Sequence, residues 1–321
     1  MSALQESARP SLTVRELLAR CAGTPLADLT LRAGASGLDR RIAQVSLQKT
    51  GLALTGQPHY LEDGRVLLFG RSEVQYLADL DAGERRRRLQ DVLRPGLPCI
   101  VVTAGLPIDG ALVEEADARG VPVLTTDVLT SAALVALTGI LEEGLAPITM
   151  LHGVLIDILG LGVLLLGESG IGKSECALDL VVRGHRLVAD DAVEITRRGA
   201  VLVGTSPPLT RHHMEVRGLG IMNVQDLFGV ASTRHSMQVE FIVRLVRWDI
   251  HTEYERLGLD EQTEPLLGLP VPVVTLPVGP GRNIGILVEV AARRHLLLAR
   301  GVSAAQRLAA RLDAELQAGE S

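Results

Sequence analysis

Apolar runs in the second half of the chain follow the spacing of a strand and then of a helix. Residues 163–166 (VLLL) form a short apolar run that ends at Gly167, which is typical of a buried strand leading into a turn. Farther along, the apolar residues of segment 175–183 recur on one helical face, and Gly184 stands where such a helix would end. The pattern predicts a strand, a glycine-rich turn and a helix in succession.

The first part of the chain shows a similar alternation. Thr13 and Glu16 have the spacing of a capping box, which predicts the start of a helix. Further apolar runs predict an α/β domain, with strands at 66–70, 99–103 and 121–124 and helices at 72–80 and 109–119. A helix over 130–144 should join this domain to the next. We therefore expect an N-terminal α/β domain over residues 1–131, structural or regulatory, and a C-terminal domain over 132–321.

Two apolar runs, 154–158 and 163–166, flank a Leu-Gly-Leu-Gly segment and predict a β-hairpin centred on Gly160-Leu161. This hairpin would give the strand before the glycine-rich turn an antiparallel neighbour, with His152 opposite the turn. His152 could then lie beside a bound phosphate, or it could be a strand-end residue in water. Strands are also predicted at 186–189 and 284–290, and an amphipathic helix at 303–316.

The turn itself, GESGIGKS, matches the phosphate-binding motif G-x-x-x-x-G-K-[ST]. Backbone N–H groups of such a loop and the following helix N-terminus face an anion. Lys173 would reach the β- and γ-phosphates of ATP, and Ser174 would hold Mg²⁺. A glycine turn that matches the motif by chance is the alternative. The predicted ATP-binding residues are Gly167, Glu168, Ser169, Gly170, Ile171, Gly172, Lys173 and Ser174.

Composition supports a special role for Lys173. Thirty of the 32 basic residues are Arg, and the two lysines are Lys49 and Lys173. A compact ammonium fits a cradle of backbone groups, whereas the planar guanidinium of Arg is larger. Lys49 needs no such explanation, because one surface lysine is ordinary.

Overall charge and composition narrow the function classes. The formal net charge is −6, and aromatic residues make up 2% of the chain, so a nucleic-acid surface is not indicated. Three widely separated cysteines fit neither a disulfide framework nor a zinc site, which favours the cytoplasm. We expect no signal peptide and no membrane span.

Further candidate residues follow from polar positions at strand ends and in loops. Asp190 and Asp191 end a predicted strand, where a carboxylate could bind a metal or accept the proton of a hydroxyl, although Asp pairs are also common in turns. Neighbouring strand residues point to opposite faces, so the two should have different roles. Glu215 lies in a glycine-rich segment, and Arg282 lies in a Pro/Gly loop that suits phosphate binding or plain solvation.

These pieces together resemble the HPr kinase/phosphorylase family, bacterial enzymes that act on a serine of HPr, a carrier of the sugar phosphotransferase system. The resemblance covers nearly the whole chain. It is carried by an ordered series of segments: GLALTG, LPI, LAPITMLHGVLID, GESGIGKSECAL, RGHRLVADD, MEVRGLGIMNV, YERLG and PVGPGRN.

The resemblance implies roles for particular residues. His152, Lys173, Asp191 and Arg256 match catalytic residues, and Asp191 would take the serine proton. Ser174 and Glu215 match metal ligands. Residues 277–282, with Pro277, Gly281 and Arg282, match a segment linked to dephosphorylation.

The resemblance also implies the reaction and the assembly. The chain would be an ATP-dependent, Mg²⁺-requiring serine kinase of HPr that also uses inorganic phosphate to dephosphorylate HPr and release pyrophosphate. Its C-terminal phosphate-loop domain would resemble phosphoenolpyruvate carboxykinase, and the protein would be a cytoplasmic homohexamer acting in carbon catabolite regulation.

Two positions depart from the family pattern. Asn223 stands where an acidic residue is usual, and Gly279 where a basic residue is usual. Gly279 bears on dephosphorylation more than on the kinase reaction. The alternatives are a small-molecule kinase, which leaves the first domain, Arg256 and residues 277–282 unexplained, and a non-catalytic nucleotide sensor, which would need neither His152 nor Asp191.

Overall fold

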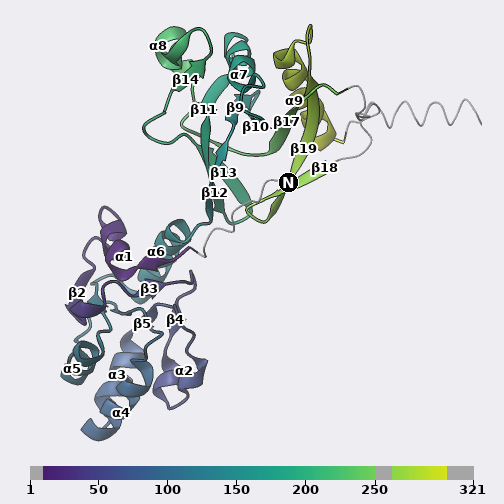
Figure 1. Ribbon diagram of the computed structural model, residues 1–321. Coiled ribbons are helices and arrows are strands. Elements are labelled where there is room, and N and C mark those ends of the chain that lie inside the picture. Colours follow the sequence, from purple (N-terminus) through teal and green to yellow (C-terminus); the bar gives the residue numbers. More distant parts are fainter. Residues whose placement is uncertain (1–9, 250–261, 302–321) are drawn as a thin grey trace, which may run out of the picture. The chain divides into compact units, whose positions relative to one another are not determined.

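The computed structural model describes residues 10–249 and 262–301, which divide into two compact units between Pro147 and Ile148 (Figure 1). The sequence places the division near residue 131, but the helix that begins there belongs to the first unit. This helix, α6 (Thr130–Gly144), buries Ala133, Leu137 and Leu141 in the core of the first unit. Arg256 and the helix predicted at 303–316 lie outside the described residues.

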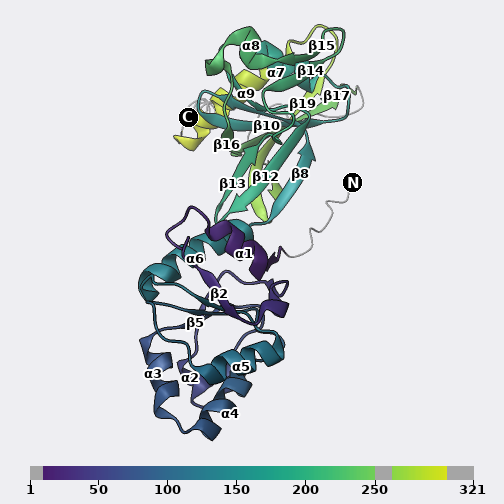
Figure 2. The ribbon, with the colours of Figure 1, turned by 90° about the vertical axis from the view of Figure 1, so that its left-hand side faces the viewer.

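The first unit is a five-stranded sheet covered on both faces by helices (Figure 2). Its strand order is β2-β7-β6-β5-β4, with β4 to β7 parallel and β2 antiparallel at one edge. Alternate strand residues explain the layers: Leu67 and Phe69 pack toward α2–α5, whereas Leu68 packs toward α1 and α6. The elements, besides α6, are β1 (Leu12–Thr13), α1 (Val14–Cys21), β2 (Thr30–Ala33), β3 (Arg41–Ile42), β4 (Gln48–Lys49), α2 (Gly51–Leu54), β5 (Leu67–Phe69), α3 (Arg71–Asp79), α4 (Ala82–Val92), β6 (Ile100–Val102), α5 (Gly110–Arg119) and β7 (Val123–Thr125).

A six-stranded sheet forms the centre of the second unit, in the order β11-β9-β10-β17-β19-β18. Helices α7 and α9 pack on one face of it, and a four-stranded sheet, β16-β13-β12-β8, packs on the other. A hairpin of β14 and β15 adds to the helical side. The strands are β8 (Ile148–His152), β9 (Val154–Ile158), β10 (Leu161–Gly167), β11 (Arg186–Ala189), β12 (Ala192–Arg198), β13 (Val201–Thr205), β14 (His213–Val216), β15 (Gly220–Asn223), β16 (Ser236–Gln238), β17 (Phe241–Arg247), β18 (Gln262–Leu266) and β19 (Leu269–Val278); the helices are α7 (Lys173–Val182), α8 (Val224–Phe228) and α9 (Ile284–Ala299).

The predicted hairpin before the glycine-rich turn is confirmed, with its centre one residue earlier than expected. Strands β9 and β10 are antiparallel, and Ile158 pairs with Leu161, so the turn is Leu159-Gly160. Both turn residues have positive φ angles, 57° and 88°, as a two-residue hairpin turn of type I′ requires. On its other side β10 pairs in parallel with β17, so the sheet is mixed.

The strand predicted at 284–290 is wrong, because this segment begins helix α9. Asn283 caps the helix by accepting a hydrogen bond from the N–H of Ile286 at 2.9 Å. Val288 and Ala292, four residues apart, are fully buried against the sheet. The β-branched residues suggested a strand, but their helical spacing and the Asn cap determine the local structure.

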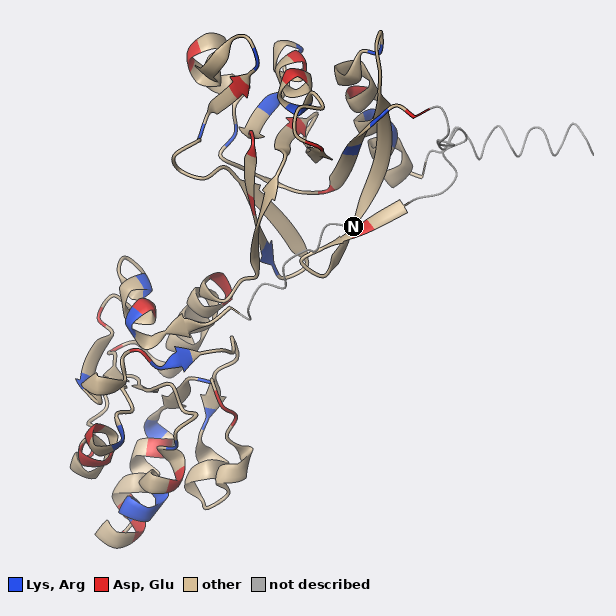
Figure 3. Cartoon of the chain, in the orientation of Figure 1, with Lys and Arg blue, Asp and Glu red and all other residues tan. Residues whose placement is uncertain are grey.

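Basic and acidic side chains are interspersed in both units (Figure 3). The arginine run 85–88 on α4 forms ion pairs with Glu84, Asp109, Glu114 and Glu115. Among the helices of the described residues, none is long and apolar enough to cross a membrane.

Candidate active site

The glycine-rich loop joins β10 to α7 in the way the sequence predicts. Gly170 and Gly172 have φ angles of 78° and 102°, which favour glycine. Gly172 is the N-cap of α7 and offers no side chain to the first-turn N–H groups, so these groups can face a ligand. A Cβ atom on Gly170 would lie 2.7 Å from Nη2 of Arg217, so the guanidinium of Arg217 lies directly against the loop.

Lys173 folds back over this loop. Its Nζ donates to the carbonyl oxygens of Gly167 and Glu168, at 3.0 and 3.1 Å. The residue is only 6% exposed, and burial lowers the pKa of its ammonium group, while Asp191, Asp190 and Glu175 oppose that shift. The loop thus holds a partly desolvated ammonium group where an anion would meet the helix N-terminus.

His152 links Lys173 to Asp191. Nζ of Lys173 lies 3.1 Å from Nε2 of His152, and Nδ1 of His152 lies 2.9 Å from Oδ1 of Asp191. An ammonium group can only donate, so the hydrogen-bond network assigns Nε2 as the acceptor and places the ring proton on Nδ1. His152 reaches this place from β8, where it pairs with Ala192, the residue that follows Asp191.

Two neighbouring aspartates have different environments, as the sequence predicts for adjacent strand-end residues. Asp190 is 3% exposed, and burial raises the pKa of its carboxyl group. Its Oδ1 accepts from Oγ of Ser174 at 2.9 Å, and its Oδ2 accepts from the N–H of Glu215 at 3.2 Å. The Asp191 side chain is 73% exposed, so its carboxylate reaches solvent at the edge of the site. The Asp191 backbone has a φ angle of 67°.

The β14–β15 hairpin closes another side of the loop. Asp190 fixes the backbone at Glu215, and Glu215 is exposed. Asn223, at the end of β15, caps α8 by accepting from the N–H groups of Gln225 and Asp226. This cap gives the Asn223 side chain a structural role at the start of α8.

Three parallel strands, β10, β17 and β19, bring further residues to the same edge of the sheet. At the carboxyl end of β17, Arg247 forms an ion pair with Glu168 of the loop at 3.4 Å. The next residue, Trp248, stacks against the guanidinium of Arg282, 5.5 Å from the ring centroid. A Cβ atom on Gly279 would lie 3.3 Å from Cβ of Trp248, so glycine leaves room for the indole.

Most sequence-predicted site residues of the described segments therefore lie near the glycine-rich loop. His152 contacts both Lys173 and Asp191, and Asp190 joins Ser174 to the backbone of Glu215. Pro277, Gly281 and Arg282 lie at or just after the end of β19, at the same edge of the sheet. The sequence marked Asp190 only as one of two candidate carboxylates, without assigning it a role, and did not mark Arg217 or Arg247 as site residues. The adjacent Asp pair was a signal for Asp190. Nothing local marked Arg217 or Arg247, because their contacts with the loop depend on long-range packing.

A glycine-rich loop at a helix N-terminus, a buried lysine and paired carboxylates define a mixed α/β domain with the arrangement typical of phosphate-transferring sites. Family comparison agrees with this class. The chain matches the profile of the HPr serine kinase N terminus over residues 12–141 and that of the HPr serine kinase C-terminal domain over residues 143–312. The chain belongs to the HPr serine kinase family.

Relatives match over most of the chain. It is 44% identical over 291 residues to HPr kinase/phosphorylase of Geobacter sulfurreducens, covering 90% of this chain and 91% of the relative. It is 42% identical over 294 residues to HPr kinase/phosphorylase 1 of Oceanobacillus iheyensis, covering 91% and 95%. A solved structure of the HPr(Ser) kinase/phosphatase from Coxiella burnetii is 34% identical and covers 48% of this chain and 93% of its own, with a TM-score of 0.45.

Proposed function

We propose that this protein transfers the γ-phosphoryl group of ATP to a serine of HPr, and that it also removes that group by phosphorolysis. The observation that carries the proposal is the Lys173–His152–Asp191 chain beside the glycine-rich loop. A cation that can bind phosphate and a carboxylate that can take a hydroxyl proton are joined by one imidazole. A small-molecule kinase or a nucleotide sensor would not account for the two HPr serine kinase family models, which together match residues of both units.

ATP would bind with its phosphates along residues 167–174. The uncapped N–H groups at the start of α7 and the ammonium of Lys173 would face the β- and γ-phosphates. On binding, Nζ of Lys173 would exchange its contacts with the carbonyls of Gly167 and Glu168 for phosphate oxygens.

The residues around Ser174 fit a magnesium ion. Its hydroxyl and the carboxylate of Asp190 are hard oxygen donors, which Mg²⁺ prefers, and the ion usually needs only one or two carboxylates besides phosphate and water. Glu215, whose backbone N–H donates to Asp190, would add its carboxylate, as the family resemblance implies. The described residues hold no cluster of three His, Cys, Asp or Glu side chains suited to a metal, so a site completed by the nucleotide is the better fit. When bound, Mg²⁺ would neutralise charge on the phosphates.

In the kinase direction Asp191 would accept the proton of the serine hydroxyl while that oxygen bonds to the γ-phosphorus and the bond to ADP breaks. His152 would hold the Asp191 carboxylate through Nδ1–H and stay hydrogen-bonded to Lys173 through Nε2. In phosphorolysis an oxygen of inorganic phosphate would attack the phosphoserine, Asp191 would return the proton to the serine oxygen, and pyrophosphate would leave.

Arg282, with Pro277 and Gly281, would hold the incoming phosphate. Its Nη1 donates to the carbonyl of Pro277 at 3.0 Å, and Trp248 fixes its guanidinium from the other side. Arg256 would act as a further catalytic arginine by family resemblance.

The wider assignments rest on the family resemblance. We propose that the protein is a cytoplasmic homohexamer of the sugar phosphotransferase system that takes part in carbon catabolite regulation. Its second unit would share the phosphate-loop architecture of phosphoenolpyruvate carboxykinase, which agrees with an antiparallel neighbour to β10.

The forward reaction can be tested by incubating the protein with ATP, Mg²⁺ and HPr and weighing HPr by mass spectrometry. The proposal requires one added phosphoryl group, located on serine by fragmentation. ATP consumption with HPr left unmodified would contradict it.

A further inference from the structure

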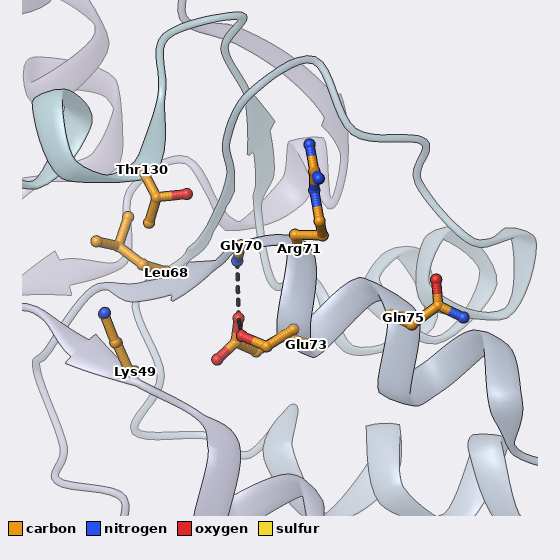
Figure 4. Close-up of a pocket in the computed structure, with 8 residues that line it drawn as sticks. Lys49, Leu68, Gly70, Arg71, Glu73, Gln75 and Thr130 are labelled. Carbon is orange, nitrogen blue, oxygen red and sulfur yellow. Dashed lines mark hydrogen bonds between the residues drawn. The ribbon is translucent and has the colours of Figure 1, made fainter.

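Figure 4 shows a pocket of about 560 Å³ in the first unit, where α3 begins beside Lys49. Its buried acid, Glu73, accepts from the N–H of Gly70 at 3.0 Å and so completes the capping box of α3. The fold itself accounts for this carboxylate, and Lys49 is an exposed lysine. The second unit, in contrast, contains a buried donor for which the fold does not account.

This donor belongs to Arg211, which lies two residues before β14. Its Nε atom is buried, and within residues 10–249 and 262–301 no hydrogen bond or ion pair involves its guanidinium. Buried N–H donors nearly always have an acceptor, and one without an acceptor is destabilising. The described chain supplies no acceptor here, so Arg211 marks a position where a ligand could supply one.

Other basic residues lie near Arg211, at one end of the four-stranded sheet. Strands β13 and β16 lie side by side, and Thr205, the last residue of β13, pairs with Ser236, the first residue of β16 (Figure 2). The chain therefore leaves β13 and enters β16 at the same end of the sheet. His212 and His235, one from each connecting segment, lie close enough there for His235 to affect the pKa of His212.

The charged groups that act on His212 are all basic. Burial, and then Arg211, His213 and His235, lower the pKa of its imidazole, and no carboxylate of the described residues is among the causes. Asp226, the one acidic residue of α8, is exposed and does not act on it. The cluster thus lacks a counter-ion, and an anion would relieve the repulsion among its cations.

The backbone fixes these side chains at the start of β14. His212 has a φ angle of 65°, and its carbonyl accepts from the N–H of Val224 at 2.8 Å. Nδ1 of His213 lies 2.8 Å from the carbonyl oxygen of Arg211, which can only accept, so Nδ1 carries the proton. Nε2 of His213 has no partner among the residues that the structure describes, and protonation of the ring would make it a donor.

We propose that Arg211, His212, His213 and His235 form a site that binds a phosphate dianion. The guanidinium offers donors in the fork geometry that matches phosphate oxygens, and protonated imidazoles add further N–H donors. Since protonation adds both charge and donors, binding becomes tighter as the pH falls from 8 to 6. The site shares no residue with the glycine-rich loop and does not depend on the proposed reaction.

NMR of the full chain, labelled with ¹³C at the histidine Cε1 atoms, follows each histidine separately, and single His→Asn variants assign the signals. Sulfate is the first probe, because it stays doubly charged from pH 6 to 8, whereas phosphate groups gain a proton near pH 6. Sulfate should shift the signals of His212, His213 and His235 together, at least about tenfold more tightly at pH 6 than at pH 8. Inorganic phosphate at pH 8 should shift the same three signals, and His152 reports any anion at the glycine-rich loop. No response of the three signals to sulfate at pH 6 would overturn the proposal.

Three variants test the contacts. Arg211→Gln should weaken sulfate binding at pH 6 at least about tenfold, because charge-assisted hydrogen bonds are lost. Arg198→Gln removes the same charge from an exposed residue at the end of β12 and should leave binding unchanged. His235→Asn should reduce the difference in affinity between pH 6 and pH 8, because one titrating group is removed.

Two results would mean that sulfate is attracted only by overall charge, and either would overturn the proposal. One is an equal loss of binding in the two arginine variants, and the other is a sulfate affinity that does not change with pH. A response to glycerol 3-phosphate without a response to inorganic phosphate would overturn the assignment to the free dianion.

Discussion

Replacing Asp190 with Asn should stabilise the second unit while removing kinase activity. Asp190 is 3% exposed, and burial raises the pKa of its carboxyl group, so at neutral pH the fold holds a charge that is costly to desolvate. Asn has nearly the same shape. It can accept from the N–H of Glu215 and donate to Oγ of Ser174, whose hydroxyl can reverse its role.

The size of the gain follows from the balance at Asp190 between the desolvation cost that is removed and the two hydrogen bonds, which Asn keeps. Removing a buried charge while both hydrogen bonds persist should change stability by about as much as one hydrogen bond contributes, so we expect a net gain of about 1 kcal/mol for Asp190→Asn. With a urea m-value of about 2 kcal/mol/M, the unfolding midpoint should rise by about 0.5 M.

The pH dependence has a definite sign. Below pH 3.8, the ordinary value for Asp, the carboxyl group is protonated in both the folded and the unfolded states and carries no penalty. As pH rises through the raised pKa, the folded wild type loses stability relative to the variant. The advantage of Asp190→Asn should therefore be present at neutral pH and disappear in acid.

Trp248, the single tryptophan, lies in the second unit, so its fluorescence reports the unfolding of that unit. The measurement is a urea titration of the full chain with EDTA present, so that no divalent ion occupies the site. Asp191→Asn is the matched control: its side chain is 73% exposed and Asn tolerates its positive φ, so its midpoint should not move although its kinase activity should be lost. Loss of stability in Asp190→Asn, or full kinase activity of this variant, would refute this account. Full activity would mean that Asp190 only joins Ser174 to the β14–β15 hairpin.

Three other predictions concern neighbouring residues. Lys173→Arg should lower phosphoryl transfer at least about 100-fold, since the larger fork does not fit the loop; near-normal turnover would contradict the size argument. Burial lowers the pKa of His185, which faces Glu289 and Arg293 of α9 and Asp157 of β9. Wild-type stability should therefore fall as pH drops below 6.5, and His185→Gln should lose this pH-dependent component. A urea midpoint that changes equally in wild type and variant between pH 7 and pH 5 would count against it. Trp248→Ala should reduce phosphorolysis about 2- to 5-fold more than the kinase rate, with Trp248→Phe intermediate, because stacking on Arg282 is lost; equal effects on both rates would exclude this positioning role.

Local patterns predicted the elements that carry the phosphate-loop motif. The strand–loop–helix order from β10 to α7 and the capping box at Thr13 are both present, because each depends on a few adjacent residues. Helix α9 was predicted as a strand because Ile and Val dominate its start, whereas packing on the sheet and the Asn283 cap make it helical.

The relation between distant segments was harder to predict. The sequence suggested His152 as a neighbour of the loop, but its place on β8, in a different sheet from β9, depends on the pairing with β12. The contact of Arg217 with Gly170 and the pocket around Lys49 arise from packing that no local pattern records.

The central claim is that one site in the second unit carries out both reactions. It is tested most directly by assaying wild type and Lys173→Ala side by side, with HPr phosphorylation followed by mass spectrometry and pyrophosphate release followed from serine-phosphorylated HPr and inorganic phosphate. Our account predicts that wild type performs both reactions and that Lys173→Ala loses both together while its urea unfolding remains cooperative. Phosphorolysis that persists in Lys173→Ala would contradict a shared site.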